Sequence, residues 1–172
     1  MLETKRLVFR KITPDDLPWL IEMRTPDAVN RYLGGSEMQN PEALAKRMSF
    51  YLECHEKHGF GFCIMTFKST GEQIGTSGLQ PLEETGEIEV GYNLSEKYWR
   101  QGFGYEAAMA WLRYGFENCG LTRIVAVAHP DNTGSWRIME KCGMKFEKNE
   151  THYGFDCVLY AISKDEFLAS NP

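Results

Sequence analysis

The sequence contains no hydrophobic run long enough for a transmembrane helix. No apolar stretch among its 172 residues approaches the roughly 18 residues that a membrane span needs. The opening segment MLETKRLVFR also lacks the apolar region of a secretory signal. We therefore expect no membrane partner and a cytoplasmic location.

The sequence also lacks closely paired cysteines. Its five cysteines are scattered, without a Cys-x-x-Cys pair, at Cys54, Cys63, Cys119, Cys142 and Cys157. An odd number without zinc-type spacing predicts free thiols rather than a disulfide framework or a zinc ribbon. The nearest approach to a metal-ligand cluster joins Cys54, His55 and His58 to Cys63, but this spacing is not that of a known zinc site. We expect no bound metal.

An excess of positive charge is missing as well. The 19 Lys and Arg residues are outnumbered by 24 Asp and Glu residues, which gives a formal net charge of −5. Binding to a nucleic-acid backbone normally needs clustered Lys and Arg, so we expect no direct nucleic-acid partner. The acidic balance mildly favours a cationic substrate.

The hydrophobic patterning predicts one α/β domain over residues 1–172. Proline-containing caps start helices at Thr13 and Asn40, and Phe60, Phe62 and Trp111 are expected in the core. Strands are expected over 7–12, 62–67, 73–79, 87–94, 123–128, 144–146 and 155–162, and two further helices over 104–119 and 131–141.

One glycine turn stands out, in the stretch YWRQGFGYEAA over 98–108. Backbone N–H groups at the start of the following helix suit a diphosphate, and the turn would supply charge and donors beside them. The residues concerned are Arg100, Gln101, Gly102, Phe103, Gly104 and Tyr105. A dinucleotide-binding turn is disfavoured because Ser95 to Trp99 separate the turn from its strand. A tight turn without a ligand stays open.

Several motifs together identify a family. The chain opens with Thr4-Lys5-Arg6-Leu7-Val8-Phe9-Arg10, continues with Gly91-Tyr92 before the glycine turn, and closes with Asn132, Ser135 and Glu140-Lys141-Cys142-Gly143-Met144. With these motifs the chain resembles the GNAT superfamily of N-acetyltransferases, in the branch of the RimJ and RimL enzymes. The resemblance runs from Thr4 to about Phe167. Trp99 stands where the superfamily's phosphate motif usually has Gln or Arg.

The resemblance implies a fold and a reaction. It implies a GNAT fold of the α/β (α+β) class, with a mixed, mostly antiparallel, splayed sheet of six to seven strands and about four helices. It implies acetyl-CoA as co-substrate and direct transfer, in a ternary complex, to a primary amine. That amine is a protein N-terminus of the ribosomal-protein type or a small molecule, with the segment around Tyr32 bordering its pocket. A homodimer is common among such relatives.

Two glutamates are candidates for the general base. Strand alternation puts Glu87 and Glu89 on the same face as Gly91 and Asn93, on the strand where the superfamily often places this base. Glu89 is preferred because it is nearer the expected splay, although two solvated carboxylates remain an alternative. The resemblance also implies that backbone N–H groups of Tyr92, Asn93 and Leu94 bind the thioester oxygen and pantetheine.

The usual proton donor of the superfamily is absent from this sequence. The superfamily's usual Tyr is replaced by Met139, and the RimL resemblance suggests Ser135 instead, although a simple helix-start hydroxyl is an alternative. Asn132 is either a cofactor contact or a helix cap. The missing Tyr keeps open a second functional class, a non-catalytic module that binds or senses acyl-CoA.

Overall fold

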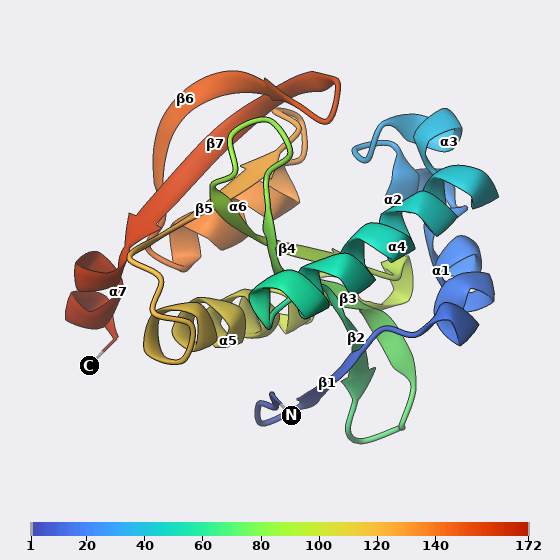
Figure 1. Ribbon diagram of the computed structural model, residues 1–172, viewed down its shortest axis with the longest axis horizontal. Helices are drawn as coiled ribbons and strands as arrows, with labels where there is room; N and C mark the ends of the chain where they lie inside the picture. The colour runs from blue at the N-terminus through green and yellow to red at the C-terminus, as the bar shows by residue number, and fades with distance from the viewer. Residues whose placement is uncertain (1, 172) are drawn as a thin grey trace.

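A seven-stranded sheet organises the chain. The computed structural model describes residues 2–171, and its strands lie in the order β1-β2-β3-β4-β5-β7-β6 (Figure 1). Neighbouring strands are antiparallel except β4 and β5, so the expected mixed, mostly antiparallel sheet is confirmed. The strands are β1 (Leu7–Lys11), β2 (Cys63–Phe67), β3 (Gln73–Pro81), β4 (Ile88–Leu94), β5 (Arg123–Ala128), β6 (Lys145–His152) and β7 (Phe155–Ser163).

The helices are more numerous than the four expected. Those four are α1 (Leu17–Arg24), which follows a 3-10 turn over Pro14–Asp16, α4 (Pro41–His58), α5 (Phe103–Glu117) and α6 (Thr133–Lys141). The additions are the single turns α2 (Asp27–Asn30) and α3 (Gly35–Met38) and the terminal α7 (Lys164–Ser170). The single turns are too short for an apolar stripe. The start of helix α7 could have been predicted from the sequence, because Ser163 and Glu166 form a capping box. None of the helices described is long and apolar enough to cross a bilayer.

Helices cover both faces of the sheet. Helices α5 and α6 pack on one face, where Phe103, Ala107 and Leu112 join strand residues in the larger core. Helices α1 and α4 cover the other face over β2 and β3, with Met48 and Tyr51 packed near Ile64. In Figure 1, α4 crosses in front of β3 and β2. The residues expected in the core, Phe60, Phe62 and Trp111, are all buried.

A polar clamp ties the N-terminal segment to the start of α5. The Glu106 carboxylate accepts from the Thr4 hydroxyl at 2.5 Å, the Arg6 amide at 2.9 Å and the Arg6 guanidinium at 2.6 Å. Arg6 also donates to the Gln101 carbonyl at 2.9 Å and lies over the Phe103 ring at 4.2 Å. Although burial opposes ionisation, these donors hold the pKa of Glu106 below its usual value. The N-terminal motif and the glycine turn are therefore one structural unit.

Removing the charge of this clamp should destabilise the fold. We expect Glu106→Gln to lower the free energy of unfolding at neutral pH by about 1–2 kcal/mol, because three partly buried donors lose an ionised acceptor. Since the folded pKa is depressed, this stabilisation is present above the ordinary carboxyl pKa and is lost as pH falls through the depressed value. Denaturant unfolding across pH measures it. The control is Glu117→Gln, which breaks an exposed pair with Arg113 and should cost under about 0.5 kcal/mol; equal losses would contradict the clamp.

Candidate active site

The turn before α5 leaves backbone donors without an intrahelical partner. Gly102 is the N-cap of α5 and has φ +80°, a left-handed conformation that favours glycine. The first intrahelical bond of this turn runs from the Glu106 amide to the Gly102 carbonyl, at 3.0 Å. The N–H groups of Phe103, Gly104 and Tyr105 precede it and have no intrahelical acceptor, as at any helix start. Such a group of donors at the positive end of the helix dipole favours an anion.

The other residues of the turn have more specific tasks than expected. Arg100 is exposed and has φ +59°. The side-chain amide of Gln101 donates to the Lys97 carbonyl at 2.8 Å and braces the turn. At Gly104 an added Cβ would lie 2.9 Å from Cδ1 of Ile138. This glycine therefore allows α6 to pack closely on α5, in addition to any contact with an anion.

One edge of β4 is open. Strands β4 and β5 pair at a single position, Glu89 with Val125, and diverge beyond it. The Ser95 amide donates to the Ile74 carbonyl of β3 at 2.9 Å, so alternation directs the Asn93 N–H toward β3 and the N–H groups of Tyr92 and Leu94 toward the opening. The prediction that the Asn93 amide is available was therefore wrong: the antiparallel ladder with Thr76 engages it.

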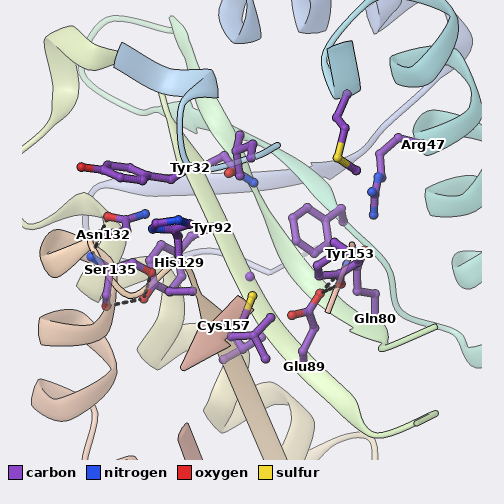
Figure 2. A pocket seen from close by; sticks show the side chains of 18 of the residues that line it. Tyr32, Arg47, Gln80, Glu89, Tyr92, His129, Asn132, Ser135, Tyr153 and Cys157 are labelled. Atoms are coloured by element: carbon purple, nitrogen blue, oxygen red, sulfur yellow. Dashed lines mark hydrogen bonds between the residues drawn. The ribbon is translucent and has the colours of Figure 1, made fainter. Parts of the chain in front are cut away.

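A cavity of about 130 Å³ adjoins this opening. It is lined from β4, from β5 and the start of α6, from α4, from the 32–39 segment, and from the turn between β6 and β7. Figure 2 shows Glu89, Gln80 and Tyr153 grouped on one side and Tyr32, Asn132 and Ser135 on the other. Tyr32 thus borders this cavity.

Glu89 lies at the cavity wall in a hydrogen-bonded cluster. Its side chain is buried, with 5% of the residue exposed. Gln80 donates to Oε1 of Glu89 at 2.5 Å, and the Tyr153 hydroxyl donates to the same oxygen. Burial raises the pKa of Glu89 above its usual value, while the two hydrogen bonds and the nearby Arg47 oppose that rise. A buried carboxylate with a raised pKa, held in one orientation, is suited to accept a proton.

Tyr153 reaches Glu89 from the tip of a hairpin. It lies between β6 and β7 with φ +56°, and its backbone N–H donates to the Glu84 carboxylate at 2.9 Å. The guanidinium of Arg47 lies 5.1 Å from the centre of the Tyr153 ring. Neither Tyr153 nor Gln80 was predicted from the sequence. Only the strand register, which joins residues 64 positions apart, brings Tyr153 to the site.

The structure separates the two candidate glutamates. Glu87 precedes β4 and does not line the cavity. Its carboxylate accepts from Arg123 at 3.0 Å, and Arg123 also pairs with Glu147 at 2.7 Å. Glu87 thus belongs to a partly exposed surface ion-pair network, whereas Glu89 is the acidic group that faces the cavity.

Two hydroxyls lie across the cavity from Glu89. Ser135 donates from Oγ to the Tyr92 hydroxyl oxygen at 3.3 Å, and Tyr92 donates to the Ser135 carbonyl at 3.0 Å. Burial raises the pKa of Tyr92 well above its usual value. Asn132 caps α6 by accepting from the Ser135 amide at 3.3 Å, and Met139 is buried at the cavity wall. The sequence analysis named Ser135 as a candidate proton donor, but it named Tyr92 only for its backbone N–H and not for its side chain.

Known proteins are similar to this chain in sequence and in architecture. A family model described as an acetyltransferase (GNAT) domain matches residues 6–145. The uncharacterized N-acetyltransferase YoaA of Bacillus subtilis is 34% identical, covering 95% of this chain and 97% of that protein. An acetyltransferase structure from Agrobacterium tumefaciens is 25% identical, has a TM-score of 0.83 and matches 94% of this chain and 92% of its own. RimL, a ribosomal L7/L12 α-N-protein acetyltransferase in complex with coenzyme A, is 18% identical with a TM-score of 0.77, covering 95% of this chain and 97% of its own.

Two glycines with the same backbone conformation allow the turn to be tested. Gly71, at φ +74°, lies in an exposed hairpin turn where an added Cβ would meet nothing within 4 Å, and Gly102 has φ +80°. Alanine at either position should cost about 1–2 kcal/mol of unfolding free energy. Only Gly102→Ala should also weaken binding of coenzyme A measured by calorimetry, because it distorts the donors of the turn. Unchanged coenzyme A affinity in Gly102→Ala would contradict the assignment of the turn.

Proposed function

Because the chain belongs to the GNAT family of N-acetyltransferases, we propose that it transfers the acetyl group of acetyl-CoA directly to a primary amine bound in the cavity. The observation that carries this proposal is the position of Glu89. It is a buried carboxylate with a raised pKa, and it lies where the single β4–β5 pair ends and the open edge of β4 begins. An amine at this point has both a base and an open strand edge beside it.

The chain offers a suitable set of groups for acetyl-CoA, the co-substrate of this family. The N–H groups of Phe103, Gly104 and Tyr105 would hold its diphosphate. The open N–H groups of Tyr92 and Leu94 would bind the pantetheine arm as an added strand does. The co-substrate supplies an acyl group already activated as a thioester, so positioning the amine beside it provides much of the rate acceleration. A covalent acyl-enzyme is not required.

Glu89 is proposed as the general base. The acceptor amine is mostly an ammonium at neutral pH, since amine pKa values are about 8–10, and it must lose a proton before it attacks. Glu89 takes this proton directly or through water. Tyr153 and Gln80 act as positioning residues, because their donors fix the Glu89 carboxylate and keep it ionisable despite burial.

Ser135 and Tyr92 are proposed to protonate the departing thiolate. Their hydroxyls are hydrogen-bonded to each other at the start of α6, on the side of the cavity opposite Glu89 (Figure 2). A Tyr hydroxyl that resists ionisation remains protonated and available as a donor near neutral pH. This pair would do the work of the Tyr that Met139 replaces.

The two glutamates provide a matched test of the base. We expect Glu89→Gln to lower kcat/KM for acetyl transfer by about 10²–10⁴-fold, because the general base is lost. Glu87→Gln should leave it nearly unchanged, since Glu87 pairs with Arg123 away from the cavity. Free-thiol release from acetyl-CoA with a panel of primary amines, small molecules and peptide N-termini, measures both. Coenzyme A binding without thiol release for any acceptor would indicate a non-catalytic acyl-CoA module.

The hydrogen bond from Tyr153 should appear in the pH profile. This bond lowers the pKa of Glu89 against the effect of burial, so Tyr153→Phe raises that pKa further. Because the base acts when deprotonated, the acidic limb of kcat/KM should move to higher pH, with activity partly recovered at alkaline pH. Steady-state kinetics across pH measures the shift. A uniform loss of activity with an unmoved limb would show that Tyr153 does not act through Glu89.

A further inference from the structure

A second charged group at the cavity has no acidic partner. Arg24, the last residue of α1, lines the cavity and is 4% exposed. Its guanidinium makes only long hydrogen bonds to neutral oxygens: to Gln39 at 3.3 Å, to Tyr51 at 3.3 Å and to Thr76 at 3.5 Å. The Nε atom is buried without a hydrogen-bond partner. A buried cation held in this way is costly unless an anion joins it.

The cavity as a whole is cationic. Among its described lining residues Glu89 is the sole acid, whereas Arg24 and Arg47 are both cations. The chain carries a formal charge of −5, and that balance suggested a cationic substrate. The cavity reverses this expectation. A simple ammonium entering it meets two guanidinium groups, so a ligand with an anion of its own is better matched.

The positions of Arg24 and Glu89 set the spacing between the anion and the amine of that ligand. Arg24 contacts Thr76, and Glu89 contacts Gln80, four residues further along β3. Strand rise puts the backbones of Thr76 and Gln80 about 13 Å apart. Between them the Phe62 ring covers Gly91 and stacks on Tyr51, with ring centres 4.7 Å apart. The two charged ends are thus joined by an apolar floor on one face of the sheet.

We propose that the acceptor is an ω-amino acid or another compact primary amine whose second, anionic group, a carboxylate or a phosphate, lies several bonds from the amine, and that Arg24 binds this anion. The inference rests on the proposed function, since Glu89 receives the amine while Arg24 holds the opposite end. A guanidinium is suited to this task because its planar donors match carboxylate and phosphate oxygens. The small volume of the cavity favours a compact acceptor.

Paired acceptors isolate the anion. β-Alanine, γ-aminobutyrate and ε-aminocaproate are compared with propylamine, butylamine and hexylamine, which have similar amines but no carboxylate. O-Phosphoethanolamine compared with ethanolamine tests phosphate in the same way. We expect at least one anionic member to exceed its neutral partner by roughly ten- to a hundredfold in kcat/KM, the range for hydrogen bonds to charged groups. The preferred chain length reports the spacing between Glu89 and Arg24.

Two variants assign the preference to Arg24. Arg24→Met removes the cation, and it should abolish the preference without lowering the thermal unfolding midpoint, because an unpaired buried charge is replaced by an apolar side chain. Gln39→Glu keeps Arg24 but puts a carboxylate beside its Nη1, so it should also abolish the preference. If Arg24→Met fails to fold, Gln39→Glu still decides the question. A preference that survives in Gln39→Glu would overturn the proposal.

Calorimetry separates this proposal from the proposed function. The same compounds are titrated into the protein saturated with coenzyme A, where no transfer occurs. Anionic members should bind roughly tenfold or more tightly than their partners, and Gln39→Glu should remove the difference. Thiol release that is equal for both members of every pair, with equal binding, would overturn the anion site and leave acetyl transfer standing. Selective binding of the anionic members without thiol release would support the anion site and overturn acetyl transfer.

Discussion

The early divergence of β4 from β5 is the constraint on which the candidate site depends. The two central strands are parallel and pair only at Glu89 and Val125. A parallel pair needs a crossover connection, and here that crossover is α5. Its N-terminus therefore lies beside the end of β4, where Gly104 lies close to side chains of Leu94 and Tyr92. The open edge of β4, the position of the α5 N-terminus and the cavity all result from the early divergence of these two strands.

The N-terminal segment keeps that helix start in place. Thr4 and Arg6 hold Glu106 in the first turn of α5, and Arg6 also holds the Gln101 carbonyl of the preceding turn. A carboxylate in the first turn is favoured by the helix dipole, but here it is already occupied by donors. The backbone N–H groups at the mouth of the helix are left for another anion. The clamp thus fixes the position of the helix start relative to the N-terminal segment.

Sequence patterns predicted the local parts of this arrangement. Alternation over 87–94 correctly gave β4, and the glycine turn with its following apolar stripe gave α5. The preference for Glu89 over Glu87 came from position along the strand, and the cavity favours the same residue. The partners of Glu89 could not be predicted, because Gln80 and Tyr153 reach it only through the register of β3 and the β6–β7 hairpin. The net charge of the chain could not predict the charges in the cavity, because it is an average over the whole chain and does not report buried groups such as Arg24.

The hairpin tip also determines when during folding Glu89 acquires its surroundings. The Tyr153 hydroxyl donates to Glu89, which lies 64 positions earlier in the sequence. The Tyr153 backbone N–H donates to Glu84, in the loop before β4. Synthesis proceeds from the N-terminus, and contacts between distant residues form slowly. A nascent chain that ends before this hairpin would already contain the glycine turn and Glu89, yet that carboxylate would be more hydrated and less basic. The raised pKa of Glu89 is therefore acquired late, after most of the sheet has been made.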